Sequence, residues 1–428
     1  MIDLDLICDQ PDRVKQGIKN KGFDPSIIDR VLKVAETRRQ LIAAVEQWRQ
    51  QRNQLTQLRR GFAGQGKKDI EQGRKIKEML RRLEPDLKAV EQELKQLLYQ
   101  IPNLPAADVP VGKDESENVV MRQWPVRRAG EGQPKKLSFS PKAHFELGES
   151  LDLIDTQRAA KVAGTRFGYL KNEAVFLEFG LIQLALALLT KEGFKPVLPP
   201  VMIAVDAMRK MGYLEHGEEK ERYILDQDQL VLVGTAEQAI GPMHQDEVLA
   251  EKDLPLRYVG FSTCFRREAG SYGKDTKGIL RVHQFNKVEM FSYARPEEAD
   301  REHEFLLAME EKLMRALKLP YQVVKMCSGD LGIPAARKYD LEAWFPAEKK
   351  YRETHSTSTC TDFQARRLNI KFRRQGGQLE FVHTLNGTAF SERPILAILE
   401  NYQQKDGSVV VPTALQKYTG FKKIPAQK

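Results

Sequence analysis

Apolar residues recur at alternating spacings of four and three residues in two long segments near the start of the chain. The first seam consists of Ile27, Val31, Val34, Leu41, Val45, Trp48 and Leu55, with Arg38, Arg52 and Arg59 at further seam positions. The second seam consists of Ile76, Leu80, Leu83, Leu87, Val90, Leu94 and Leu97. This spacing is typical of coiled coils, and a glycine-rich stretch, 61–66, separates the two segments. We therefore expect an antiparallel two-helix arm over about residues 26–100, on the order of 50 Å long, with a kink or weakened turn at Pro85.

After the second seam the chain becomes irregular. Prolines at 102, 105, 110, 125 and 134 and glycines at 112, 130 and 132 interrupt any regular element up to about Pro141. Clusters of proline and glycine mark loops and domain boundaries. We expect an N-terminal domain over residues 1–104 and a larger domain over residues 105–428.

The larger domain begins with a helix–strand pattern. An apolar helix is predicted over Glu173–Leu189 and a strand over Phe194–Leu198, followed by Pro199 and Pro200. A further apolar strand, Leu230–Val233, leads into Gly234-Thr235-Ala236-Glu237. Helix–strand units are common, so this pattern alone does not identify a function.

Two strands of alternating polarity follow, joined by a loop rich in glycine and lysine. The first ends at Cys264–Glu268 and the second covers His283–Phe291. Side chains two residues apart on a strand share a face, so Arg266 and Glu268 are expected to point together, and Phe285, Lys287 and Glu289 likewise. An arginine and carboxylates on one face suit a nucleoside triphosphate and a small charged substrate. The alternative is a surface hairpin with ion pairs.

Charge is concentrated in the predicted arm. The chain has 428 residues and a net charge of +9, and residues 30–100 hold 17 Lys and Arg against 9 Asp and Glu, which is +8 of that total. Such asymmetry indicates a polyanionic partner. A dimerisation coil with a solvated face is the alternative, but arginines at seam positions favour contact with a nucleic-acid backbone.

Cysteine usage and hydropathy exclude several classes of protein. The four cysteines, Cys8, Cys264, Cys327 and Cys360, form no CxxC pair, which argues against a disulfide scaffold or a cysteine zinc site. Cys360 and His355 could form a nucleophilic pair, although reduced structural cysteines are the simpler interpretation. The best candidate for a membrane span, 174–189, is interrupted by Glu178 and Gln183, and the N-terminus lacks a signal pattern, so we expect a cytoplasmic protein without membrane contact.

The amino-acid sequences of several segments resemble those of a known family. Phe265–Gly270 (FRREAG), a loop and then Arg281–Met290 (RVHQFNKVEM) resemble motif 2 of class II aminoacyl-tRNA synthetases, and among these the seryl-tRNA synthetases. The predicted helix and strand ending at Pro199-Pro200 resemble motif 1, the dimer interface. Glu392-Arg393-Pro394, leading into an apolar helix that contains Leu399-Glu400-Asn401, resembles motif 3. The resemblance extends from the N-terminus to about Pro412.

This resemblance implies a fold, an activity and partners. The fold is α+β: a class II catalytic domain with a mainly antiparallel sheet flanked by helices, plus the N-terminal coiled-coil arm. The implied reaction forms seryl-adenylate from L-serine and ATP and then transfers the seryl group to the 3′ end of tRNA(Ser). The resemblance allows tRNA(Sec) as a further acceptor. The arm would grip the tRNA, the protein would form a homodimer, and ATP would bind with Mg²⁺.

The resemblance also implies roles for individual residues. The arginines Arg266, Arg281 and Arg393 would be catalytic, with Arg266 on the α-phosphate and the other two near the γ-phosphate. The ATP-binding set is Arg266, Arg267, Glu268, Glu353, Thr354, His355, Ser356 and Arg393, in which Glu268 reads the adenine amino group and Glu353 and Ser356 hold Mg²⁺. The serine-binding set is Thr235, Ala236, Glu237, Glu289 and Thr388, with Thr235 and Glu237 on the α-ammonium group and Glu289 and Thr388 on the hydroxyl.

Three segments depart from the family pattern. Residues 212–217 replace a glycine-rich stretch, His355 stands at an unusual position, where its side chain is expected to turn away, and the spacing before Arg393 is one residue short. Two rival functions follow from the same resemblance. A synthetase-like ligase that charges a carrier protein would lack the long arm, and a non-catalytic RNA-binding homologue would have lost Arg266, Glu268, Glu289 or Arg393.

Overall fold

A computed structural model describes residues 1–61, 67–125, 137–269 and 277–427. The chain divides into two compact units, Met1–Pro102 and Asn103–Lys428, next to the expected boundary after residue 104. Parts of the expected interhelix glycine stretch, of the proline-rich linker and of the Gly- and Lys-rich loop lie outside the described residues.

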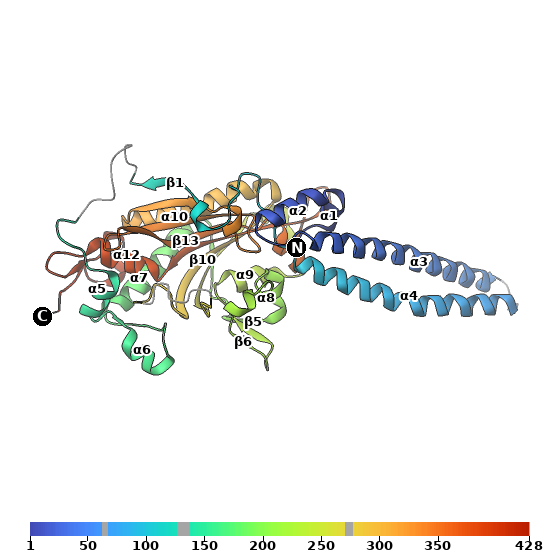
Figure 1. The fold of residues 1–428 in the computed structure, drawn as a ribbon, viewed down its shortest axis with the longest axis horizontal. Coiled ribbons are helices and arrows are strands. Elements are labelled where there is room, and N and C mark those ends of the chain that lie inside the picture. Colours follow the sequence, from blue (N-terminus) through green and yellow to red (C-terminus); the bar gives the residue numbers. More distant parts are fainter. Residues whose placement is uncertain (62–66, 126–136, 270–276, 428) are drawn as a thin grey trace. The chain divides into compact units, whose positions relative to one another are not determined.

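The first unit is helical. Two short helices, α1 (Leu4–Asp9) and α2 (Pro11–Asn20), precede two long ones, α3 (Ile27–Gly61) and α4 (Lys67–Tyr99), which form the antiparallel hairpin in Figure 1. Most seam residues are buried or half-buried, with Val45, Leu55, Ile76 and Leu80 packed together. The predicted coiled coil is confirmed, and α4 continues as a helix through Pro85.

The seam arginines lie at the edge of the hairpin rather than inside it. Arg38 pairs with Glu91 of the opposite helix at 3.3 Å, and Arg49, which is not a seam residue, pairs with Glu84 at 2.8 Å. Arg52 is exposed, because its long side chain can reach water from a seam position. The side chain of Arg59 lies outside the described part of the chain. These cross-helix pairs help to fix the register of the two helices.

The second unit is built on an eight-stranded sheet with strand order β1-β11-β12-β13-β16-β10-β9-β4. Its strands are β1 (Val119–Trp124), β4 (Lys195–Val197), β9 (Leu256–Phe265), β10 (Gln284–Ala294), β11 (Tyr321–Lys325), β12 (Arg337–Phe345), β13 (Lys350–Thr359) and β16 (His383–Ser391). Neighbouring strands are antiparallel except for β4 and β9. The predicted mainly antiparallel sheet is confirmed.

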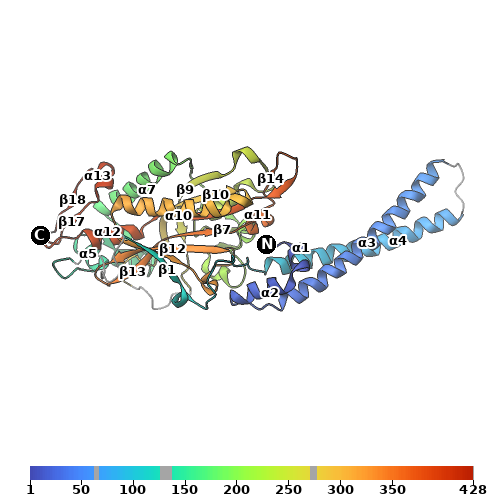
Figure 2. The same cartoon turned by 90° about the horizontal axis from the view of Figure 1, so that it is seen from above.

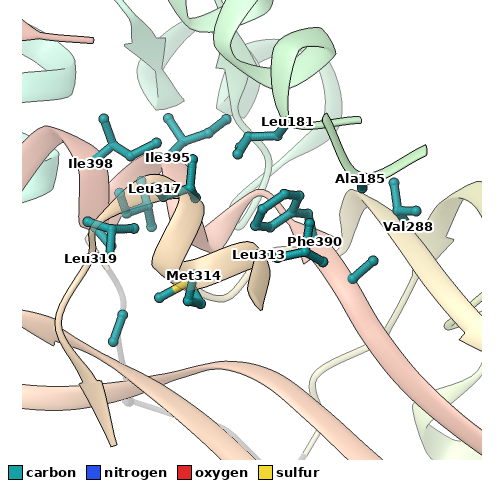
Figure 3. Close-up of a cluster of buried hydrophobic side chains, with 14 of the residues drawn as sticks. Leu181, Ala185, Val288, Leu313, Met314, Leu317, Leu319, Phe390, Ile395 and Ile398 are labelled. Atoms are coloured by element: carbon teal, nitrogen blue, oxygen red, sulfur yellow. The ribbon is translucent and has the colours of Figure 1, made fainter. Parts of the chain in front are cut away.

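Three helices cover one face of this sheet: α7 (Glu173–Lys191), α10 (Ala299–Leu317) and α12 (Arg393–Tyr402). Figure 2 shows α7 and α10 running over the strands. Leu181 of α7, Leu313 of α10 and Ile395 of α12 meet Val288 and Phe390 of the sheet in the main core (Figure 3). The opposite face therefore remains open for a site.

Smaller elements complete this unit. The helices are α5 (His144–Ser150), α6 (Thr156–Ala163), α8 (Val205–Met211), α9 (Glu237–Ile240), α11 (Phe363–Leu368) and α13 (Thr413–Thr419). The strands are β2 (Ile154–Asp155), β3 (Tyr169–Leu170), β5 (Met202–Ala204), β6 (Ile224–Leu225), β7 (Leu230–Leu232), β8 (Val248–Ala250), β14 (Lys371–Arg373), β15 (Leu379–Phe381), β17 (Val409–Val410) and β18 (Lys423–Ile424). Short 3₁₀ turns occupy Glu115–Glu117, Glu218–Glu221, Gly241–His244, Glu251–Asp253, Pro296–Glu298 and Ser328–Asp330.

Helix α7 corrects one expectation. It is long and apolar enough to cross a membrane by length and composition, and is the one such helix in the described ranges. The expectation that Glu178 and Gln183 interrupt this segment was wrong, because the three charged residues Glu173, Glu178 and Lys191 leave the average of its 19 residues apolar. The core helix of a globular domain has the same composition. Helix α7 buries Glu178, and its burial together with the nearby Glu392 carboxylate raises the pKa of Glu178 to about 8.

Candidate active site

Two adjoining cavities open on the face of the sheet that the core helices leave free. The first encloses about 210 Å³ and the second about 490 Å³. Six residues line both: Arg266, Glu268, Arg281, Lys287, Lys338 and Ser356. Arg266, Glu268 and Arg281 come from the segments next to the facing ends of β9 and β10, and the other three come from β10, the start of β12 and β13. Central strands of the sheet therefore form the floor of one continuous site.

The first cavity combines an apolar wall with positive charge. Ile279, Leu280, Val282 and Phe285 line it beside Arg266. The Arg266 guanidinium lies 5.2 Å from the centre of the Phe285 ring, and its Nε donates to the carbonyl oxygen of Gly234 at 3.2 Å. A flat aromatic ring next to a fixed guanidinium suits a heterocyclic base that carries phosphate groups.

Glu268 reaches the site by a route that the strand pattern did not predict. Strand β9 ends at Phe265, so Arg266 and Glu268 lie beyond it, and Glu268 adopts the left-handed backbone conformation with φ 51°. The two residues nevertheless line both cavities together. Glu268 lies 3.6 Å from Arg281, an ion pair that spans the two ends of the β9–β10 loop.

A β-bulge places Glu353 and Ser356 on the same side of β13. Glu353 pairs with Glu342 and His355 pairs with Leu341, so Thr354 is the extra residue. Residues three apart would otherwise face opposite sides of a strand. Both Glu353 and Ser356 line the first cavity, and the hydroxyl of Thr354 donates to the carbonyl of Leu341.

Arg393, the first residue of α12, closes this side of the cavity. Its Nη1 donates to the Glu353 carboxylate at 2.8 Å and to the Glu353 carbonyl at 2.9 Å. Burial acts to raise the pKa of Glu353, but the charges of Arg393 and Lys338 outweigh it and hold that pKa well below its ordinary value. The carboxylate is therefore ionised and offers oxygen atoms to a cation as well as to Arg393.

The second cavity holds two buried carboxyl groups. Glu237 accepts hydrogen bonds from the Tyr213 hydroxyl and from Asn386 Nδ2 at 3.3 Å. Burial and the nearby Glu289 carboxylate raise the pKa of Glu237 to about 7, against the lowering effect of the Tyr213 hydrogen bond. An ammonium group that entered beside Glu237 would give this carboxylate a positively charged partner.

Glu289 is the second of these groups. Its carboxylate forms an ion pair with Lys287 at 2.7 Å and accepts a hydrogen bond of 3.5 Å from the Thr388 hydroxyl. Burial raises the pKa of Glu289, while Lys287 acts to lower it. The hydroxyl and the carboxylate together can bind a small polar group such as an alcohol.

Most of the predicted site residues line one of the two cavities, and three do not. Ala236 packs in a hydrophobic cluster, and Arg267 stacks its guanidinium 5.5 Å from the Tyr223 ring. His355 is buried, with its ring against Phe390 and its Nδ1 2.8 Å from the Thr354 hydroxyl. The expectation that this side chain turns away is confirmed, and these contacts give no support to a Cys360–His355 pair.

Sequence reasoning left several lining residues unassigned. Lys338 of β12 lines both cavities, and Tyr213, Arg222 and Asn386 line the second. Lys287 stood on the predicted face but received no role, although its position between Phe285 and Glu289 was a usable signal. The others come from segments distant in sequence, and no local pattern marks them.

Comparisons with known proteins agree with the fold and with its division into two units. Residues 1–105 match the seryl-tRNA synthetase N-terminal domain, and residues 221–402 match the tRNA synthetase class II core domain (G, H, P, S and T). The chain is 43% identical to a serine–tRNA ligase of Dictyoglomus turgidum over the full length of both proteins. It is 46% identical to that of Thermotoga maritima over 99% of this chain and 100% of the relative.

A solved structure extends the similarity to three dimensions. The seryl-tRNA synthetase of Pyrococcus horikoshii, crystallised with ATP, matches with a TM-score of 0.93 and 41% identity over all of both chains. Full-length identity at this level leaves no part of the fold unaccounted for. With its helical arm, its antiparallel sheet and its paired cavities, the chain belongs to the seryl-tRNA synthetase family of class II aminoacyl-tRNA synthetases.

Proposed function

We propose that this protein forms seryl-adenylate from L-serine and ATP and transfers the seryl group to the 3′ end of tRNA(Ser), with tRNA(Sec) as a further acceptor. The observation that carries the proposal is the position of Arg266. It lies where an aromatic, arginine-lined cavity meets a cavity with buried carboxylates. ATP would occupy the first cavity and serine the second.

The reaction at this junction is an in-line displacement. The serine carboxylate attacks the α-phosphorus, the new carboxyl–phosphate bond forms, and pyrophosphate leaves. The nucleophile is already ionised, so no protein base is required. Catalysis then consists of alignment and charge neutralisation. Arg266 would hold the α-phosphate, while Arg281 and Arg393 would hold the leaving pyrophosphate end.

The donor set also fits a magnesium ion. The bulge at Thr354 brings the Glu353 carboxylate and the Ser356 hydroxyl to one side of β13, and both are hard oxygen donors. When bound with ATP, Mg²⁺ would neutralise phosphate charge. Glu353 would share its oxygens between that ion and Arg393. The backbone at Thr354 and His355 would border the nucleotide, and Glu268 would read the adenine amino group.

The second cavity accounts for the choice of serine. Glu237 and Thr235 would bind the α-ammonium group. Glu289 would bind the hydroxyl together with Thr388, which reaches Glu289 from the wall of the first cavity. Alanine has no hydroxyl to use the remaining hydrogen-bonding capacity of the buried Glu289 and Thr388 groups, a loss that supports strong discrimination. Threonine would have to be rejected by size, since its hydroxyl can make the same hydrogen bonds.

The arm supplies a second binding surface. Its net charge of +8 over residues 30–100 and its two-helix form support contact with the phosphate backbone of tRNA. Such contacts read the shape of RNA more than its sequence. ATP and tRNA are cytoplasmic substrates, so the proposal also assigns the protein to the cytoplasm.

A homodimer is part of the same proposal. Phe176 and Phe179 of α7 are 54% and 55% exposed, and Leu198 beyond β4 is 82% exposed. Exposed large apolar side chains on one helix and just after the following strand support an interface between two copies. Light scattering at micromolar concentration should give twice the mass of the chain, and a monomer mass would contradict this assignment.

The central test is ATP–pyrophosphate exchange without tRNA. We expect exchange with serine, and at least about 100-fold lower kcat/KM with alanine or glycine, because these substrates have no hydroxyl for the pocket to bind. Transfer to tRNA(Ser) and to a carrier protein is then measured with the same enzyme. No exchange with any amino acid would support the non-catalytic homologue, and transfer to the carrier alone would support the other rival.

A further inference from the structure

A one-residue bulge in β16 sets the geometry of the proposed hydroxyl pocket. Val288 of β10 pairs with Phe390, and Glu289 pairs with Thr388, so Ala389 is the extra residue. Directly paired residues of antiparallel strands share a face. The bulge therefore brings Thr388 opposite Glu289, where the 3.5 Å hydrogen bond forms.

Behind the bulge, a buried carboxyl group fills the space of a missing side chain. Glu310 of α10 is fully buried. A Cβ atom built on Gly387 would lie 3.3 Å from Glu310 Oε1 and 3.2 Å from both Met290 Cε and Thr357 Oγ1. Gly387 thus leaves just enough room for the Glu310 carboxyl to lie against the back of β16.

This carboxyl group is poorly matched to its surroundings. Neither oxygen of Glu310 has a hydrogen bond of normal geometry among the described residues. The backbone N–H of Thr388, the residue after Gly387, is near enough to act on the carboxyl group and to favour a lower pKa. Burial, together with the Glu289 and Asp340 carboxylates, raises the pKa of Glu310 well above its ordinary value. The environment therefore favours the neutral form of the group, because an ionised carboxylate without a partner is costly to bury.

An apolar side chain of similar size would fit this core at less cost. A polar group is useful here for one reason: a bulge removes backbone groups from the strand ladder, and Thr388 lies next to the extra residue. An oxygen behind the strand can restrain that N–H and with it the side chain of Thr388 on the other face.

We propose that Glu310 is a positioning residue for amino-acid specificity: its carboxyl group, seated against Gly387, holds the Ala389 bulge so that Thr388 faces Glu289. Glu310 does not touch the substrate. The inference rests on the proposed role of Glu289 and Thr388 in binding the serine hydroxyl, and it adds a residue from a helix on the opposite side of the sheet to that pocket.

Two substitutions at position 310 separate polarity from volume. Glu310→Gln keeps an oxygen acceptor and should keep the serine KM within about 3-fold, since the environment already favours the neutral form of the native group. Glu310→Met keeps the length and loses the acceptor. It should raise the serine KM about 10- to 100-fold and reduce the preference for serine over alanine about 10-fold, while the ATP KM changes less than 2-fold.

The matched control is Glu304→Met. Glu304 is an exposed carboxylate on the same helix, where it accepts a hydrogen bond from Tyr339, and its replacement should change neither KM. If Glu310→Met does not fold, Gly387→Ala tests the same contact from the strand side. Its new methyl group would lie 3.3 Å from Glu310 Oε1 and press on the carboxyl group, and it should give the same rise in serine KM. Unchanged serine kinetics in the folded variant, or equal changes in the two KM values, would overturn the inference.

Glu289→Gln is measured in parallel to keep the two ideas apart. If this variant retains the native serine KM, the assignment of Glu289 to the hydroxyl fails, whatever Glu310 does. If Glu289→Gln loses serine binding while Glu310→Met does not, the pocket stands and the inference about Glu310 is refuted.

Discussion

Arg266→Ala is expected to lower kcat/KM for serine-dependent pyrophosphate exchange by about 10³-fold. A loss of this size is typical when an enzyme loses one preorganised hydrogen-bond donor that stabilises the charge of the transition state. Arg266 is one of the six residues that line both cavities, and the carbonyl of Gly234 fixes its guanidinium through a 3.2 Å hydrogen bond. The loss should appear in kcat more than in KM, because charge on the α-phosphate is redistributed only as pyrophosphate leaves.

Arg266→Lys separates charge from geometry. An ammonium group restores the positive charge but not the planar pair of donors, so we expect it to recover about 10-fold of the lost rate at most. The matched control is the neighbouring arginine: Arg267 lines neither cavity and stacks on Tyr223. Arg267→Ala should remain within about 3-fold of the native rate. Comparable losses in both alanine variants would place the effect in the folding of the β9–β10 loop and contradict the assignment.

Local periodicity was enough to predict the elements that bury a continuous apolar face. The coiled-coil seams placed α3 and α4, and alternation placed β9 and β10, because each pattern records which side of an element is buried. Strand ends were less well predicted. The backbone turns at Glu268, which adopts the left-handed conformation. Nothing in the amino-acid sequence indicates this turn or excludes that the strand continues through Glu268.

The two bulges show why sequence alone could not give the site. An extra residue is defined only by the partner strand, and the strands opposite Thr354 and Ala389 are β12 and β10. Without the first bulge, Glu353 and Ser356 would face opposite sides of β13. The resemblance to motif sequences supplied both residues, whereas the structure supplies the reason that they can act together.

The same limit applies to residues brought in from a distance. Lys338 and Tyr213 reach the cavities through the fold, and Glu310 acts from a helix whose sequence reads as an ordinary amphipathic pattern. A buried glutamate in such a helix can be recognised only once its burial is known.

Substitutions in the arm should impair tRNA charging and leave adenylate formation unchanged. Lys75, Lys77, Arg81 and Arg82 are exposed on α4. Replacing all four with glutamine should raise the KM for tRNA(Ser) about 100-fold at 0.15 M salt and reduce the slope of log KM against log salt by up to about four, since each lost phosphate contact removes about one. Exchange without tRNA should stay within 2-fold, because none of these residues contributes to the cavities.

The control replaces four exposed neutral residues of α3, Gln47, Gln50, Gln54 and Gln57, with alanine. These changes keep the helix and its charge, so tRNA charging and its salt dependence should be unchanged. If the variant without the four basic residues still charges tRNA normally, the arm does not bind tRNA through these residues, and a dimerisation role for the coiled coil is favoured. Equal loss of exchange and charging would instead mean that the arm supports the catalytic unit itself, and the polyanion explanation of its charge would fail.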